Sequence, residues 1–152
     1  MNISIFYRNL LNNMTPAERL EFFKSLNRFL APLSWSKYAV NFKINEVWLV
    51  DDLRLDQSRV DHINHLIVIN TRAEAWHLYQ KYGARTPEES RLLAFLHELG
   101  HKTKRTGDVD TDEEIAWKWA TNTHKSEPQL CTELLHDYCQ WANSHHFENK
   151  IW

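Results

Sequence analysis

The stretch best suited to chemistry is His97-Glu98-Leu99-Gly100-His101, an H-E-x-x-H sequence. On a helix, residues four apart project from one face, so the two histidines would lie one turn apart. Two imidazoles at that spacing can bind one Zn²⁺, with Glu98 directed at the remaining open position. There the carboxylate can take a proton from a water whose pKa the metal lowers to about 7. The sequence therefore predicts His97 and His101 as zinc ligands and Glu98 as a general base.

The residues around this stretch favour a helix of about five turns. Thr86 is expected as its N-cap, Pro87 as its first residue and Glu89 as the partner that closes a capping box. An apolar stripe at helical spacing follows: Leu92, Leu93, Phe95, Leu96 and Leu99. The expected last turn holds cations that suit the helix dipole: Lys102, Lys104 and Arg105. Gly107 is a typical stop, and we expect the helix to be buried on the side away from the histidines.

A third protein ligand must come from elsewhere, and the acidic segment 108–120 is the best source. This segment has the composition of a second helix. Ala116 and Ala120 follow Glu113 by three and seven residues, so they form a small-residue face beside its carboxylate. Such a face would let the second helix lie close to the first. We therefore expect Glu113 as the third ligand.

The position where this second helix begins leaves alternatives open. A capping box of Thr111 with Glu114 leaves Glu113 free to bind metal. A box of Asp110 with Glu113 would free Glu114 instead. Asp108 and Asp110 are weaker candidates in the connecting loop.

The two histidines followed by Glu113-x-x-Ala116 resemble the gluzincin branch of the zincin metallopeptidases. In that branch the third zinc ligand is a Glu in an E-x-x-A sequence on the following helix. The apolar run Leu66–Asn70 resembles the strand ahead of the active helix in small bacterial and phage peptidases that cleave repressors. The resemblance covers Val47–Ala120. It departs at Trp117, where relatives often have Asn or Asp, and in a short loop before the Glu.

The resemblance implies an α+β fold, a small zincin-like domain over residues 1–152 with a short sheet packed against the active helix. Two strand-like runs, 46–55 and 65–71, are rich in β-branched and aromatic residues and should pair in one sheet. The polar stretch 56–64 between them is expected to be a loop. By the resemblance, 66–71 would lie at the rim of the cleft and pair with an extended peptide.

Further helices are expected on either side of this region. One should start with Thr15 as cap and run at helical spacing to Leu30, before Pro32. Another is expected over 73–82, and a last one over 127–145. The first 13 residues fit a strand or a helix equally well.

Composition excludes some classes of function. The net charge of −2 gives no electrostatic footprint for nucleic acid or anionic membrane. No apolar run approaches the length of a membrane span, and no signal peptide is recognisable. Cys131 and Cys139 lie eight apart on one expected helix, about 12 Å along its axis and too far to form a disulfide. We therefore expect reduced thiols and a cytoplasmic protein.

These observations predict a zinc-dependent peptidase, with one Zn²⁺ per chain and a peptide or protein substrate. Two alternatives remain. The run Phe95–Lys102 resembles the core helix of HD-type phosphohydrolases, with His62 or His65 as a further ligand, although Glu98 stands where that family has Asp. The chain could also be a non-catalytic metal-binding or interaction protein related to metallopeptidases, with Trp-rich helices as contact surface.

Peptide hydrolysis also needs a donor that stabilises the oxyanion. By the resemblance, this donor would be a His, Tyr or Arg from outside the two ligand helices. The candidates in this chain are His62, His65, His124, His136, Tyr138, His145 and His146.

Overall fold

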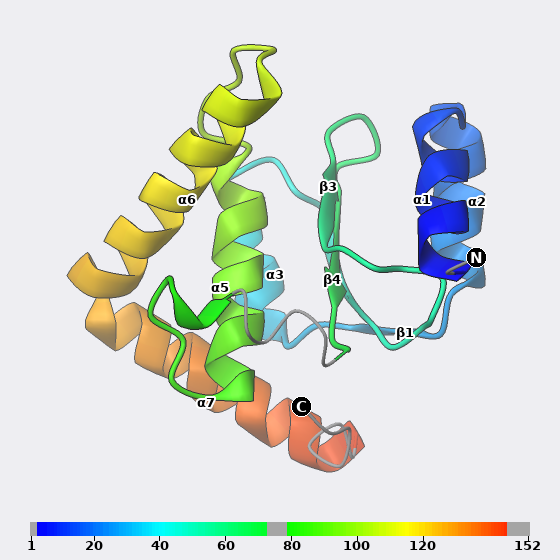
Figure 1. The fold of residues 1–152 in the computed structure, drawn as a ribbon. Helices are drawn as coiled ribbons and strands as arrows, with labels where there is room; N and C mark the ends of the chain where they lie inside the picture. Colours follow the sequence, from blue (N-terminus) through cyan, green and yellow to red (C-terminus); the bar gives the residue numbers. More distant parts are fainter. Residues whose placement is uncertain (1–2, 73–78, 146–152) are drawn as a thin grey trace.

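The computed structural model of the protein describes residues 3–72 and 79–145, which form an α+β fold (Figure 1). The helices in these ranges are α1 (Ile3–Asn12), α2 (Pro16–Ser25), α3 (Leu33–Val40), α5 (Pro87–Gly100), α6 (Val109–Ser126) and α7 (Pro128–His145). The strands are β1 (Arg28–Leu30), β2 (Glu46–Val50), β3 (Arg59–Asp61) and β4 (Leu66–Asn70). None of the described helices is long and apolar enough to cross a membrane.

The four strands form one mixed sheet in the order β1-β2-β4-β3. The expected pairing of the two apolar strands is confirmed, since β2 and β4 are parallel with Val47 opposite Ile67. The expectation that residues 66–71 form the strand at the rim was wrong. Strand β3 lies within the segment expected to be a loop, pairs antiparallel with β4, and occupies that edge itself. The short, polar sequence of β3 carries too little alternation to be recognised as a strand.

The sheet separates two apolar cores. Leu49 of β2 packs with α3, α5 and α7 on one face, whereas its neighbour Trp48 packs with α1 and α2 on the other. Side chains of a strand alternate between faces, so a strand covered on both sides reads as a continuous apolar run. Figure 1 shows α1 and α2 on one side of the sheet and α5 on the other.

The N-terminal third differs in one respect from the expected helix. Thr15 caps the start of α2 as expected, and Glu18 closes a capping box with it, but the helix ends at Ser25. Residues Arg28–Leu30 then extend as β1 and pair antiparallel with β2. Pairing with an existing sheet edge therefore overrides the apolar spacing that continues to Leu30.

The remaining helices agree largely with expectation. The ambiguous first segment contains α1, and Glu127 separates α6 from α7 ahead of Pro128. Most of the helix expected over 73–82 lies outside the described residues. Cys131 and Cys139 are free thiols, as expected.

Asp61 fixes the connection between β3 and β4. Its carboxylate accepts hydrogen bonds from the backbone of Ile63 and Asn64, from the Asn64 side chain, and from Arg19 of α2. Burial raises the pKa of Asp61, but the hydrogen bonds from Arg19 and Asn64 outweigh burial and lower it to about 2. The ionised form is therefore bound more strongly in the folded chain than in the unfolded chain.

We expect Asp61→Asn to lower the free energy of unfolding at pH 7 by on the order of 2 kcal/mol. A lowered folded-state pKa gives stability that is complete above the unfolded pKa and is lost as pH falls through the folded one. The difference between variant and wild type should therefore shrink between about pH 4 and pH 2. Urea unfolding at several pH values measures this. The exposed Asp110→Asn is the control, and a difference independent of pH would contradict the assignment.

Candidate metal centre

Helix α5 carries the H-E-x-x-H residues and begins where the sequence predicted. The Thr86 hydroxyl accepts a hydrogen bond from the backbone of Glu89, and Pro87 is the first helical residue. The Glu89 carboxylate does not close the expected capping box, because it binds the backbone and guanidinium of Arg85 instead.

Helix α5 ends earlier than expected. Its last residue is Gly100, and His101 is the C-cap. The backbone N–H and hydroxyl of Thr103 both bind the Gly100 carbonyl, which closes the helix with a tight turn. The basic residues expected in its last turn therefore lie in the following loop, together with Gly107.

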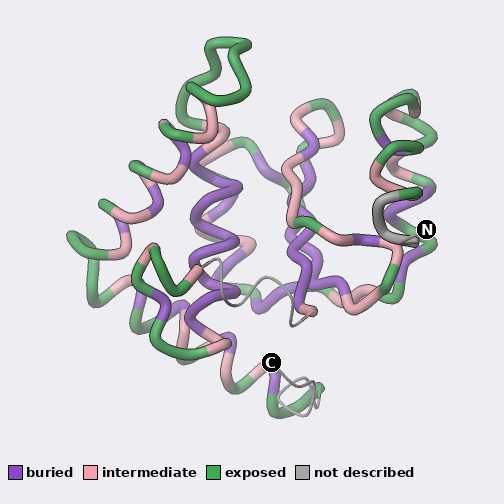
Figure 2. Tube along the Cα trace, viewed as in Figure 1, coloured by how far each residue is buried: buried purple, intermediate pink, exposed green. Residues whose placement is uncertain are grey.

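Nearly the whole of α5 is buried, from Glu89 to Gly100, and Figure 2 shows this as a continuous buried stretch. The expected exposed face is absent because α6 covers the histidine side, while the sheet, α3 and α7 cover the rest. His97 is 8% exposed and Glu98 is 4% exposed. The predicted site therefore lies at the contact between α5 and α6.

Helix α6 starts with neither of the capping boxes expected from the sequence. Asp108 is the N-cap and its carboxylate accepts a hydrogen bond from the Thr111 backbone. Asp112 reaches back to the backbone of Thr106 and Gly107. The helix thus begins earlier than either expectation, yet the Glu113 side chain is still free to turn toward α5.

The two helices approach most closely at Gly100 and Ala116. A Cβ atom added to Gly100 would lie 2.6 Å from the Ala116 carbonyl oxygen, closer than any real side chain allows. Ala116 and Ala120 are both fully buried, so the expected small-residue face is confirmed. Because Glu113 lies one turn before Ala116, this contact places its carboxylate beside the histidines that flank Gly100.

The structure brings His97, His101 and Glu113 together. The Nε2 atom of His97 lies 3.1 Å from Glu113 Oε2, and Nε2 of His101 lies 2.8 Å from Glu113 Oε1. Two ligands about 2.0–2.1 Å from a tetrahedral zinc ion lie about 3.3 Å apart. The observed separations are slightly shorter, so a small outward shift of the carboxylate would accommodate the ion. The donor set, two imidazole nitrogens and one carboxylate, suits zinc.

Glu98 competes with Glu113 for the place of third ligand. The donor atoms of His97, Glu98 and His101 lie within 4.8 Å of one another. However, Glu98 Oε2 faces Nδ1 of His97 at 2.9 Å, whereas Glu113 faces Nε2 of both histidines. An acceptor at Nδ1 holds that proton and leaves Nε2 available as a ligand. Geometry therefore favours Glu113 as ligand, with Glu98 beside the site.

Electrostatics at this centre favour a cation. Burial lowers the pKa of His97, but hydrogen bonds with Glu113 and Glu98 outweigh burial and raise it to about 9. The hydrogen bond with His97 lowers the pKa of the Glu113 carboxyl. A proton on Nε2 of His97 thus occupies the position that a metal ion would take.

Trp117, the residue that departs from the gluzincin pattern, packs against the site. Its indole stacks on the His97 ring at 4.0 Å with an angle of 12° between the planes. Tyr82 stacks on the other side of the indole at 3.7 Å. This stack restricts rotation of the His97 imidazole.

The other candidates named from the sequence lie elsewhere. Asp108, Asp110 and Glu114 are exposed. Several proposed oxyanion donors have other partners, since His124 lies 3.6 Å from Glu89, Tyr138 binds Arg91, and His145 stacks on Trp141. His65 and His136 are exposed, and His146 lies outside the described residues. His62 interacts electrostatically with His101.

Two residues near the centre were missed by sequence reasoning. The Tyr79 ring lies 5.6 Å from the Trp117 ring. Burial raises the pKa of Tyr79, and the charges of Glu98 and Glu113 raise it further, against the opposite effect of a hydrogen bond with Ser58. Arg59 of β3 also interacts electrostatically with Glu98. No pattern in the sequence indicates either one, because both come from segments that only folding brings to α5.

No protein-family model matches the chain, and no match is found among curated proteins or solved structures. The resemblance to gluzincins therefore remains a prediction based on the residues described above.

The Gly100 contact gives a direct test of how the site is positioned. We expect Gly100→Ala to push α6 away from α5, to lower the free energy of unfolding by about 1–3 kcal/mol and to weaken zinc binding. Urea unfolding and zinc titration of the folded protein measure the two effects. Unchanged zinc affinity in a destabilised variant would mean that this contact does not set the position of Glu113.

Proposed function

We propose that the protein is a zinc-dependent peptidase. His97, His101 and Glu113 are the metal ligands, and Glu98 is the general base. The observation that carries this proposal is the convergence of both Nε2 atoms of an H-E-x-x-H helix on one carboxylate from the next helix.

A bound zinc ion would act as a Lewis acid and would lower the pKa of a water molecule to about 7. The chain supplies the remaining functions. Glu98, almost fully buried, accepts a proton and passes it to the leaving amine. Trp117 keeps the His97 ring in one orientation. We assign stabilisation of the oxyanion to the Tyr79 hydroxyl, whose pKa is raised by the charges of Glu98 and Glu113.

The substrate we propose is an extended peptide. β3 is the edge strand of the sheet nearest to α5, and its outer side has no partner strand among the described residues. An exposed strand edge binds an extended peptide by adding one more strand. In this arrangement β3, rather than the interior β4, takes the role expected of the rim strand.

We also propose a cytoplasmic location, because Cys131 and Cys139 are both free thiols. The HD-type alternative requires an all-helical fold and is not supported by the four-stranded sheet.

Zinc stoichiometry tests the ligand assignment. We expect one zinc per chain in the wild type and a loss of affinity of at least about 100-fold in Glu113→Ala, because removing even a group that only orients a ligand costs about 10- to 100-fold. Glu114→Ala is the matched control, since it removes an exposed neighbouring carboxylate. Elemental analysis and competition with a zinc chelator provide the measurements. An absence of zinc in the wild type after zinc is offered would reject the proposal.

A second variant tests whether Glu98 is a general base or a metal ligand. Glu98→Gln should keep zinc and lose roughly 10²- to 10⁴-fold in peptide hydrolysis, the usual contribution of a general base. Cleavage of a mixed peptide library, followed by mass spectrometry, measures activity on many peptide sequences at once. Loss of zinc in this variant would instead make Glu98 a ligand, and full activity would remove it from the mechanism.

A further inference from the structure

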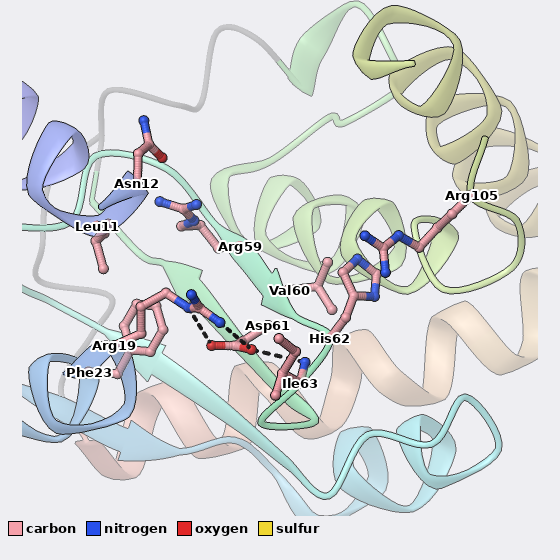
Figure 3. Close-up of a pocket in the computed structure, with 10 residues that line it drawn as sticks. All are labelled: Leu11, Asn12, Arg19, Phe23, Arg59, Val60, Asp61, His62, Ile63 and Arg105. Atoms are coloured by element: carbon pink, nitrogen blue, oxygen red, sulfur yellow. Dashed lines mark hydrogen bonds and ion pairs between the residues drawn. The ribbon is translucent and has the colours of Figure 1, made fainter. Parts of the chain in front are cut away.

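A pocket of about 340 Å³ follows the free edge of β3 (Figure 3). Residues of α1 and α2 line one side, β3 forms the floor, and the loop after α5 closes one end. Its charged and titratable lining residues are Arg19, Arg59, Asp61, His62 and Arg105. Three elements far apart in the sequence therefore bring three guanidinium groups to one pocket.

The charges of this pocket do not balance. Asp61 is the acidic residue of the lining and is already neutralised, because its carboxylate lies 3.0 Å from Nε of Arg19. Figure 3 shows this pair, with His62 and Arg105 at the other end of the pocket. Arg59 and Arg105 make no hydrogen bond or ion pair through their side chains with any residue that the structure describes. Two positive charges are thus left over.

The pKa values of neighbouring groups reflect this positive field. Burial lowers the pKa of His62 to about 4, with further lowering by Arg105, Lys102 and His101, so its ring is neutral at pH 7. Burial also lowers the pKa of the Arg59 guanidinium, as does Arg19, and these two causes outweigh the opposite effect of the Glu98, Asp61 and Asp56 charges. An ordinary arginine keeps its charge at pH 7, so a half-buried arginine without a partner favours a bound anion.

Strand β3, which forms the floor of the pocket, packs against α5, the helix that carries the candidate metal centre. Arg59 interacts electrostatically with Glu98, and His62 does so with His101. Arg105 follows His101 by four residues in the loop after α5. A peptide bound along β3 with its scissile bond at the zinc site would therefore pass the two unpaired guanidinium groups.

We infer that this pocket recognises a carboxylate of the substrate, held by Arg59 and Arg105 within a few residues of the cleaved bond. This inference rests on the proposed peptidase function and specifies its substrate class as acidic peptides. The carboxylate comes from a Glu or Asp side chain or from a free peptide C-terminus. A guanidinium binds either through charge-assisted hydrogen bonds, often in pairs.

Peptide binding to the zinc-free full chain tests the inference without any turnover. One probe is an N-acetylated, C-amidated Ala-Ala-Glu-Ala-Ala peptide, and a second has Gln in place of Glu. A third has the Gln sequence with a free C-terminal carboxylate. Titration of ¹⁵N-labelled protein, followed by NMR through the amides of β3 and the Arg59 Nε–H, gives each dissociation constant. We expect at least one carboxylate peptide to bind about tenfold or more tightly than the neutral one.

Arg59→Gln should remove this preference. Arg105→Gln changes an exposed residue, so it gives a second reading if the first variant folds poorly. The matched control is Arg28→Gln on β1, at the opposite edge of the sheet, which should keep the preference. Equal affinity of the wild type for all three peptides would overturn the inference, as would a preference that survives both Arg59→Gln and Arg105→Gln. Because zinc content is measured separately, failure of the peptidase proposal is distinguishable from failure of this one.

Discussion

The contact between Gly100 and Ala116 is the constraint on which the candidate site depends. Two helices can approach until backbone atoms touch only where one of them has no Cβ and the other has a short side chain. At that distance a glutamate one turn before Ala116 reaches the two histidines around Gly100. A longer side chain at either position would move α6 outward, and the carboxylate would face solvent instead of the imidazoles.

The burial of α5 holds the side chains of the site in fixed positions. A helix that is covered on all sides must find a partner for each polar group it carries, since an unpaired buried charge is costly. Glu89 binds Arg85, Arg91 binds Tyr138 and a backbone carbonyl, and His97 binds two carboxylates. Each of these contacts also fixes the rotation of α5 against its neighbours. The helix therefore presents its histidines in one orientation before any ligand arrives.

Charge is distributed differently on the two sides of β3. On the side of α5, two carboxylates surround the imidazoles and favour a cation. Along the outer edge, two guanidinium groups form no side-chain hydrogen bond or ion pair with a described residue and favour an anion. A peptide with a carboxylate a few residues from its scissile bond complements both regions at once. The sheet edge between them provides the backbone groups that would align such a peptide.

The sequence by itself determined the local features. The start of α5 at Thr86 and the two apolar strands follow from caps and periodicity, which act over a few residues. Spacing within each helix indicated the H-E-x-x-H residues and Glu113 as candidates, and the contact of the two helices brought them together. Tertiary structure decided the rest. β3 forms because β4 offers it an edge, α2 gives way to β1 because β2 offers another, and α5 loses its exposed face because α6 packs against it. Contacts between elements also bring three further residues toward the centre: Arg59, Tyr79 and Trp117. Their neighbours are distant in the sequence, and a local pattern carries no information about which surfaces a folded chain brings into contact.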